Sequence, residues 1–542
     1  MTDRSNHPIN PPPSLKEKVA GVMIPLFSIR TGENFGIGEI LDLIPFIDWM
    51  TRWRLKVVQI LPIFETSPHE TSPYQALSGF AIDPIYLSIQ GWEDFKKSDL
   101  ARHVYASSSI QEELRRCRAS QTVCYELIRP IKEELLTLCF DRFKREEWEK
   151  RTARAKSFQA FMDEQAEWLD DYAVFRLLKE KNGWRDWADW PPSFRDGEPP
   201  ALESLKREEE ERLLYFKYLQ WALWEQWEQA RARARERKVL LMGDLPFLVS
   251  RDSADVWRHR NSFSAEETVG APPDMFNEKG QEWGLPLFRW DAMEKKDFRW
   301  WRLRIRQARQ FYDLIRLDHV VGFFRVWAIP KNGPPHFEPP ETERQAERGK
   351  KLLNAMIEEA RPCIPIAEDL GVIPDFVYQA LEAFQIAGHK VLRWQKFDHA
   401  YHDPQEYPFV SLATTGTHDT STLVNWWKEL PFVEREAFLK MLLKGEEIPP
   451  DGPFSDELHQ AILDRLMGSG SSLVILPIQD IFGFPDQINL PSTVGYHNWR
   501  YRLPILLEGL NERSPYKEKL HFLKRIIELR RHAESGAPHA PA

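Results

Sequence analysis

The sequence has few of the features that mark several classes of protein. It contains only four cysteines, with no C-x-x-C pair and no histidines at zinc-site spacing, so neither a disulfide framework nor a zinc site is expected. No apolar run is long enough to cross a membrane, and the first residues lack the apolar core of a secretion signal. We therefore expect a cytoplasmic protein whose cysteines are free thiols.

The charge balance argues against a protein that binds nucleic acid. Acidic residues outnumber basic ones, and the formal net charge is -9. Neutralising phosphates requires a concentrated basic surface, and the one short basic run, residues 231–238, has the pattern of an exposed helix face. The sequence also lacks a calcium-loop pattern and a glycine-rich phosphate-binding loop. It therefore predicts neither a metal nor another cofactor.

What the sequence does contain is material for a large core. Hydrophobic residues make up 42% of the chain and charged residues 29%, which suits a folded protein with a soluble surface. Tryptophan is abundant, and its ring suits the apolar face of a sugar, although the same residue also fills cores and helix interfaces. No exposed amphipathic stretch indicates an obligate protein partner.

Eight short β-branched or apolar runs predict the strands of a barrel. Helical patterns separate most of them, and alternation of strand and helix is typical of a parallel sheet. Eight such units favour closure, so we expect an α/β fold of the TIM-type (β/α)8 class. The runs are residues 21–26, 56–62, 239–247, 314–318, 364–369, 390–394, 412–417 and 472–479.

Two long insertions are expected in this barrel. The catalytic unit should span residues 15–532, between a flexible leader at 1–14 and a flexible tail at 533–542. Residues 91–237 have helical spacing throughout and predict a mostly helical subdomain, whereas residues 250–298 mix Pro, Gly, aromatic and acidic residues and predict a long loop at a substrate cleft. Because the chain ends soon after the eighth predicted strand and a final helix, no C-terminal β-sandwich is expected.

The first of three strand-end acids lies in the segment YDLIRLDHVVGF. Alternation along a strand places Tyr312, Leu314, Arg316 and Asp318 on one inward face. A guanidinium beside a carboxylate favours the ionised form that a nucleophile requires. The alternative is a structural ion pair without a chemical role.

The other two acids end the next predicted strands. In PIAEDLG, Glu368 reaches the carboxyl end of its strand while Asp369 points the other way. A partly apolar pocket would favour the protonated form that a general acid requires. In ATTGTHDTST, Asp419 shares a face with Thr415 and Thr417. Capping of a loop or helix is the alternative for both acids.

The conjunction of three strand-end acids favours chemistry over capping. The carboxyl ends of the strands of a (β/α)8 barrel meet at one mouth, so the three side chains should converge there. One ionised and one protonated carboxyl group on opposite sides of a scissile bond form the minimal machinery of retaining glycoside chemistry. A third carboxylate can stabilise the oxocarbenium-like transition state.

A set of longer motifs extends from about Gly21 to Leu507. They are GVMIPLFSIRTGENFGIGEI, SPYQALSGFAIDPIYLSI, GDLPFLVSRDSADVW, APPDMFNEKGQEWGLPLFRW, IRLDHVVGFFRVW, IAEDLG, TGTHDTST and PIQDIFG with TVGYHNWRYRL. Together they resemble the 4-α-glucanotransferase family, the amylomaltases or disproportionating enzymes of the α-amylase superfamily. The resemblance implies transfer of a segment of an α-1,4-glucan donor to the 4-hydroxyl of a glucose or maltodextrin acceptor, without a cofactor.

The resemblance also implies roles for individual residues. Asp318 would be the nucleophile that forms a covalent glycosyl-enzyme, Glu368 the acid and then base, and Asp419 the transition-state stabiliser. Planar rings can stack on glucose, and amides or charged groups can bond to its hydroxyls. The residues implied in substrate binding are Ser72, Tyr74, Asp244, Asp274, Gln281, Trp283, Arg316, His319, Asp369, His418 and Asn498.

Two other functions stay open at this point. An α-1,4-glucan hydrolase would share all three acids and differ only in the balance between acceptor and water. A non-catalytic glucan-binding protein on the same barrel would be expected to lack a catalytic acid, and here all three are present.

Overall fold

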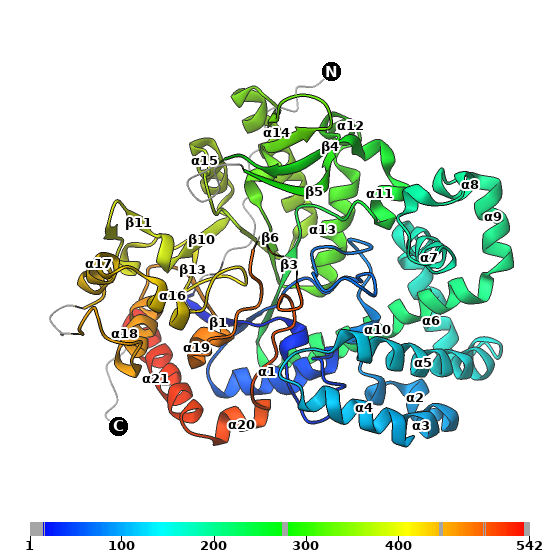
Figure 1. The fold of residues 1–542 in the computed structure, drawn as a ribbon, viewed down its shortest axis with the longest axis horizontal. Helices are drawn as coiled ribbons and strands as arrows, with labels where there is room; N and C mark the ends of the chain where they lie inside the picture. Colours follow the sequence, from blue (N-terminus) through cyan, green and yellow to red (C-terminus); the bar gives the residue numbers. More distant parts are fainter. Residues whose placement is uncertain are drawn as a thin grey trace.

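Eight parallel strands close into a barrel at the centre of the protein (Figure 1), so the predicted (β/α)8 fold is confirmed. The computed structural model describes residues 15, 17–273, 280–443, 448–491, 493 and 495–535. Around the barrel the order is β1-β14-β13-β10-β9-β6-β3-β2. The strands are β1 Val19–Met23, β2 Val57–Gln59, β3 Leu240–Leu245, β6 Leu314–Leu317, β9 Ile364–Ala367, β10 Ala387–Val391, β13 Ser411–Thr414 and β14 Leu473–Pro477.

The barrel strands are buried on both faces, as continuous apolar runs in a parallel sheet require. Every residue of β1 and β14 is buried, and each pairs in register with its neighbour. The strand predicted at residues 390–394 begins and ends earlier, as β10, because residues 392–394 form a short 3-10 helix. Among the helices that pack on the barrel strands are α10 Glu210–Arg237, α13 Arg299–Phe311, α14 Thr342–Ala360, α15 Asp375–Phe384 and α19 Ile478–Phe482.

Between β2 and β3, residues 93–237 form a mostly helical excursion at the right of Figure 1. Some of its helices are amphipathic: α4 Ser108–Ala119 buries Ile110, Leu114 and Cys117, which share one face. The predicted helical character of this segment is confirmed, while its status as a separate subdomain over 91–237 stays a prediction. The helices before α10 are α2 Glu93–Lys97, α3 Asp99–Tyr105, α4 Ser108–Ala119, α5 Tyr125–Phe143, α6 Ala153–Glu164, α7 Ala166–Lys181, α8 Pro192–Arg195 and α9 Pro199–Glu208.

Residues 250–298 differ from the long loop that the sequence predicts. They contain α11 Ala254–Arg258 and α12 Trp290–Lys295, and two antiparallel strands, β4 Phe263–Ala271 and β5 Gln281–Phe288, which join β7 Val326–Pro330 and β8 His336–Glu338 in one sheet. Gly284, which suggested a loop, has a φ of +68° and lies with Trp283 at a register shift of β5, where they have no partner on β4. The glycine therefore marks a β-bulge within a strand.

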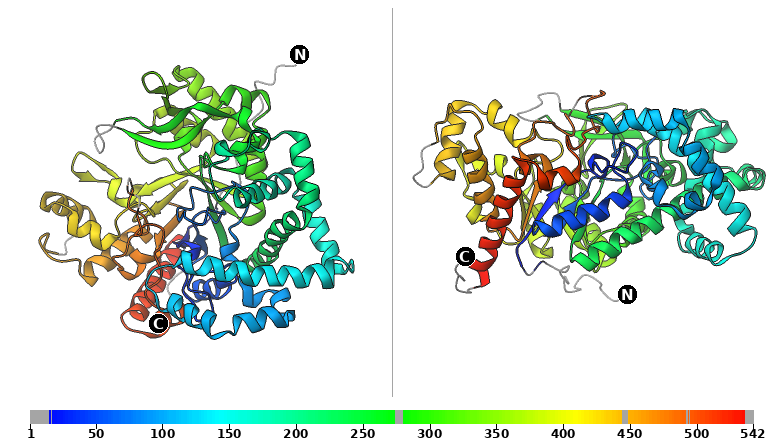
Figure 2. Two further views of the ribbon diagram at one scale, coloured as in Figure 1. Left: turned by 45° about the vertical axis from the view of Figure 1, so that its right-hand side comes forward. Right: turned by 90° about the horizontal axis from the view of Figure 1, so that it is seen from below.

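Most of the remaining elements belong to the yellow to red part of the chain, on the side of the barrel opposite the helices between β2 and β3 (Figure 2). The hairpin β11 Lys396–Phe397 and β12 Ala400–Tyr401 contacts α17. After β14 the described residues form helices and no β-sandwich. No helix in the described ranges is both long and apolar enough to span a bilayer. The remaining helices are α1 Leu43–Arg52, α16 Leu423–Glu429, α17 Phe432–Leu442, α18 Asp456–Met467, α20 Leu507–Glu512 and α21 Tyr516–Ser535.

Tyr312 lies before β6 and does not follow the alternation by which side chains of the strand point into the barrel. It was predicted to point inward with Arg316, but it precedes the first residue of β6, and its ring contacts Trp227 of the covering helix α10. The same ring packs on Gly243 of β3, where an added Cβ would lie 2.2 Å from Tyr312 Cε2. Alternation therefore applies only within the strand, and Gly243 is required by the close approach of a buried ring.

We expect Gly243→Ala to destabilise the barrel by about 1–3 kcal/mol, because the new methyl group would overpack a site whose aromatic neighbour is buried. Urea unfolding measures the change. Gly32→Ala is the control, since no atom lies within 4 Å of the position of its Cβ. Equal midpoints for the two variants would contradict the tight packing of Tyr312 on β3.

Candidate active site

The three predicted acids meet at the carboxyl ends of the barrel strands. Asp318 directly follows β6, Glu368 directly follows β9, and Asp419 follows β13 after a short loop. Because Leu317 of β6 pairs with Ala367 of β9, Asp318 and Glu368 leave adjacent strands at the same level. All three line one pocket with a cavity volume of about 360 Å³. Of the residues predicted to bind substrate, Ser72, Tyr74, Trp283, Arg316, His319 and His418 also line it.

Both carboxylate oxygens of Asp318 accept a hydrogen bond. Arg316 Nη1 donates to Asp318 Oδ1 at 2.9 Å, and the backbone N–H of Phe247 donates to Oδ2 at 3.2 Å. The same Nη1 atom lies 2.7 Å from each carboxylate oxygen of Asp244. Burial lowers the pKa of Arg316, but the two carboxylates outweigh it and raise that pKa well above its usual value. One fixed positive charge is therefore shared by two aspartates.

Asp244 lies below the mouth and does not line the pocket. It is 1% exposed and accepts a hydrogen bond of 2.7 Å from the Tyr74 hydroxyl. Burial raises the pKa of Asp244, and Arg316 opposes this effect. Tyr74 in turn stacks on the imidazole of His418, with ring centroids 5.4 Å apart. Asp244 thus fixes Arg316 and Tyr74, which themselves line the pocket.

Glu368 is held as an acid. Burial raises its pKa to about 8, and the charges of Asp318 and Asp369 add to this effect, although Arg316 and a hydrogen bond from His319 oppose it. The backbone N–H of His319 donates to Glu368 Oε2 at 2.8 Å. His319 has a φ of +46°, a left-handed conformation that is uncommon for residues other than glycine. It directly follows Asp318, and its N–H contacts Glu368. At neutral pH the glutamic acid therefore keeps its proton.

Asp419 is in the opposite protonation state. Its carboxylate accepts a hydrogen bond of 2.6 Å from Asn489 Nδ2, and its other oxygen lies 3.2 Å from His418 Nε2. Burial raises the pKa of Asp419, but His418, Asn489 and Arg316 outweigh it and lower that pKa to about 2. One pocket thus contains a protonated glutamic acid and an ionised aspartate, the separation that acid–base roles require.

The bulge in β5 brings Trp283 to the pocket. Its indole ring lies edge-on to the imidazole of His319, with centroids 5.1 Å apart. Gln281, another residue predicted to bind substrate, does not line the pocket; its side-chain oxygen accepts a 3.1 Å hydrogen bond from Trp283 Nε1. Asp274 lies outside the described residues.

Two further predicted residues face other parts of the protein. Asp369 does not line the pocket, as its outward orientation from the strand implies, and it accepts a 2.6 Å hydrogen bond from the backbone N–H of His389. Burial raises the pKa of Asp369 to about 6. Asn498 bonds to its own loop, accepting from the N–H of Leu490 at 2.9 Å and donating to the carbonyl of Thr493 at 3.0 Å.

The sequence reasoning missed two residues of this loop that do line the pocket, Asn489 and Trp499. Trp499 has a φ of +62°, and its ring lies 5.6 Å from Tyr74 and 5.8 Å from His418. A signal for Trp499 was present, because it lies in the HNW segment that contains Asn498, whereas Asn489 lies outside the motifs of this region. The loop path decides which of its polar and aromatic side chains faces the pocket.

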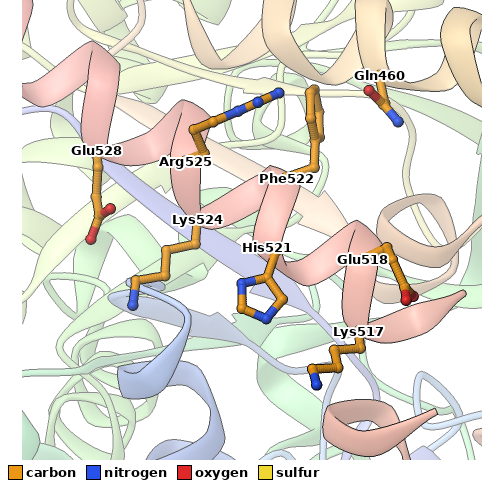
Figure 3. Close-up of a pocket in the computed structure, with 8 residues that line it drawn as sticks. All are labelled: Gln460, Lys517, Glu518, His521, Phe522, Lys524, Arg525 and Glu528. Atoms are coloured by element: carbon orange, nitrogen blue, oxygen red, sulfur yellow. The ribbon is translucent and has the colours of Figure 1, made fainter. Parts of the chain in front are cut away.

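A larger hollow of about 750 Å³ lies along α21, between exposed lysine, arginine and glutamate side chains (Figure 3). None of the predicted site residues lines it. Within the described ranges, no group of three or more His, Cys, Asp or Glu side chains is arranged to hold a metal ion. The carboxylate pocket at the barrel mouth is therefore the candidate active site.

A closed parallel barrel with acids at the ends of β6 and β9 and after β13 is typical of a (β/α)8-barrel enzyme, and carboxyl groups that share one pocket suit glycoside chemistry. Residues 24–508 match the family model described as 4-alpha-glucanotransferase, and the chain belongs to this family. It is a glycosyl-transferring enzyme, a 4-α-glucanotransferase, as the sequence motifs predicted.

Individual relatives agree with this assignment. The chain is 35% identical to the 4-alpha-glucanotransferase of Chlamydia trachomatis serovar D over 516 residues, which covers 93% of this chain and 94% of the relative. It is 29% identical to that of Streptococcus pneumoniae serotype 4, with 92% and 96% covered. Among solved structures, the amylomaltase from Streptococcus agalactiae in complex with acarbose has a TM-score of 0.79 and 25% identity, covering 95% of this chain and 99% of that one.

The raised pKa of Glu368 predicts a pH-dependent cost to stability. The folded protein binds this proton more tightly than the unfolded chain, so its contribution is fully present below the ordinary pKa and is lost as the pH rises to about 8. Glu368→Gln carries no such proton. Its stability relative to the wild type should therefore increase across this window, by about 1.4 kcal/mol per pH unit.

Urea unfolding at a series of pH values from about 5 to about 8 measures this difference. The exposed Glu436→Gln on α17 is the control, whose difference from the wild type should not follow this trend. A constant stability difference between Glu368→Gln and the wild type over the window would contradict a raised pKa.

Proposed function

We propose that this 4-α-glucanotransferase works by retaining double displacement, with Asp318 as nucleophile, Glu368 as acid and then base, and Asp419 as transition-state stabiliser. The observation that carries the proposal is the convergence of all three acids on one pocket, where burial raises the pKa of Glu368 to about 8 while His418 and Asn489 lower that of Asp419 to about 2. Its donors are α-1,4-glucans, and its acceptors are glucose and maltodextrins.

In the first step, a carboxylate oxygen of Asp318 attacks the anomeric carbon of the donor. The bond from that carbon to the leaving oxygen breaks as Glu368 gives its proton to this oxygen. Positive charge develops on the ring, and the ionised Asp419 stabilises it. The products are a glycosyl-enzyme ester on Asp318 and a shortened glucan with a free 4-hydroxyl.

In the second step, the Glu368 carboxylate takes a proton from the 4-hydroxyl of the acceptor. The acceptor oxygen attacks the anomeric carbon, and Asp318 leaves as a carboxylate. Each step inverts the configuration, so the α-linkage is restored. Glu368 again holds a proton, ready for the next cycle.

Aromatic rings around the acids support transfer to a sugar over transfer to water. Tyr74, Trp283 and Trp499 line the pocket from separate segments, and such rings bind the apolar faces of glucose units. A sugar held there excludes water from the ester. The hydrolase alternative shares the three acids, so the balance between acceptor and water separates the two. The similar amylomaltase from S. agalactiae was solved in complex with acarbose, which supports binding of a similar ligand in this pocket.

We also propose a cytoplasmic location and function without an obligate protein partner. The location is supported by the four cysteines, which are free; Cys117, Cys139 and Cys363 are buried. Free thiols are typical of a reducing compartment.

Incubation with maltotriose should give glucose and longer maltodextrins while total reducing ends stay constant, because transfer replaces each broken linkage with a new one. Chromatography of the products together with a reducing-end assay measures both. Asp318→Asn should abolish turnover, since the neutral amide is a poor nucleophile. Reducing ends that rise in step with product would show a hydrolase, and no turnover even on longer glucans would favour a binding protein.

The pH profile of kcat/KM for maltotriose should fall above about pH 8, because ionised Glu368 has no proton to give to the leaving oxygen. Initial rates across the alkaline range measure this limb. An α-maltotriosyl fluoride donor, whose fluoride leaves without protonation, should lose the alkaline limb. If the limb is identical for both donors, it does not belong to Glu368.

A further inference from the structure

Arg304 of α13 is a buried cation without a carboxylate partner. It is 1% exposed, and no carboxylate among the described residues lies within ion-pair distance of it. Its Nε and Nη2 atoms have no hydrogen-bond partner in the described part of the chain. The rings of Trp300 and Trp301 lie 4.9 Å and 5.2 Å from its guanidinium carbon. Burying a charge in this way is costly unless the charge serves another group.

Among the described residues, Arg304 donates one hydrogen bond, and it leads to the active site. Arg304 Nη1 donates to the carbonyl oxygen of Pro246 at 2.8 Å. That carbonyl and the N–H of Phe247 belong to the same peptide group, and this N–H donates to Asp318 Oδ2. The chain of contacts therefore runs from the guanidinium through one planar peptide to the acid. A donor on the oxygen of a peptide polarises it and strengthens the N–H bond on its other side.

The surroundings of Arg304 keep the guanidinium in this place. Gly79 packs directly on it, and a Cβ at Gly79 would lie 3.0 Å from Arg304 Nε. Asp255 lies nearby, but its two oxygens accept hydrogen bonds from the N–H of Gly79 and from Trp300 Nε1. Burial lowers the pKa of Arg304 to about 10, with Asp255 and Asp318 opposing, so it stays charged at neutral pH.

We propose that Arg304 is a positioning residue for glucanotransfer, which acts through the Pro246–Phe247 peptide to orient Asp318 and to stabilise its ionised form. The proposal rests on the nucleophilic role of Asp318. Arg316 holds Oδ1 directly, and the polarised peptide holds Oδ2, so the carboxylate has one donor on each oxygen. Both attack and departure need this carboxylate charged.

The acidic limb of the kcat/KM profile tests this proposal. With an α-maltotriosyl fluoride donor, the limb does not depend on proton donation by Glu368, so it reports the ionisation of the nucleophile in its surroundings. The titratable groups that face Asp318 are Tyr74, Asp244, Arg304, Arg316, His319 and Glu368. Of these, only Arg304 is altered in the test, and its own side chain does not line the substrate pocket.

Arg304→Met should shift the acidic limb upward by up to about one pH unit, because the ionised carboxylate loses a stabilising charge. Below the limb, kcat/KM should then fall about tenfold, while near the optimum it changes little. Arg304→Lys keeps the charge and should restore the limb toward that of the wild type. Arg304→Gln, which keeps an N–H donor without the charge, should show the shift and provides the test if the methionine variant does not fold.

Arg348→Met is the matched control. Arg348 is also buried, at 2% exposed, lies 4.7 Å from the Trp290 ring centroid, and donates to the backbone oxygens of Phe324 and Glu338. It is not linked to Asp318, so its loss should leave the acidic limb in place. Circular dichroism and thermal unfolding show that each variant is folded.

The outcomes separate this inference from the proposed function. Activity that survives Asp318→Asn would overturn the role of Asp318 and the inference with it. If Asp318→Asn is inactive but the limb does not move in folded Arg304→Met and Arg304→Gln, only the role of Arg304 is overturned. An equal shift in Arg348→Met would also overturn it, because the effect would then follow from losing any buried arginine.

Discussion

The shared guanidinium of Arg316 is the interaction on which the barrel mouth depends. Arg316 lies opposite Asp244 in the register of β3 and β6, and Asp318 follows it on the same side of the strand, so closure of the barrel fixes all three groups. One positive charge between two carboxylates leaves the mouth with excess negative charge. Burial is the main reason why Glu368 retains its proton; Arg316 opposes this effect, and the charge of Asp318 partly offsets Arg316. Arg316 therefore holds the nucleophile in place, whereas burial keeps the acid protonated.

The rest of the pocket comes from segments that the barrel register does not control. Tyr74 precedes the helical excursion, Trp283 lies at the bulge of β5, and Asn489 and Trp499 lie on the loop after α19. The loop after α19 is held by hydrogen bonds between Asn498 and its own backbone, and Tyr74 is held by its hydrogen bond to Asp244. The barrel strands therefore position the acids, whereas these other segments determine which ligand can bind in the pocket beside them.

The features of the barrel strands could be predicted from the sequence, whereas those of the other pocket segments mostly could not. Strands and strand-end acids were predictable because alternation and apolar runs are local signals, and strand ends of a barrel share one mouth. Tyr312 was placed wrongly because alternation was extended beyond the strand. The β4–β5 hairpin was predicted as a loop because its glycines gave a turn signal, while its partner β7 lies far along the chain. Choosing Asn489 over Asn498 required the path of the loop, which depends on hydrogen bonds that no local pattern encodes.

Buried charge at the mouth opposes folding, which limits where the protein can place it. A carboxyl group with a raised pKa and a guanidinium with no carboxylate partner both weaken the folded state relative to well-packed apolar groups. At the mouth, Asp318 and Glu368 directly follow β6 and β9, whereas β1 and β14 are buried along their whole length. The barrel body stabilises the fold, and the mouth uses part of that stability to hold groups in the protonation states that glycosyl transfer requires. Chemistry and stability are thereby assigned to different ends of the same strands.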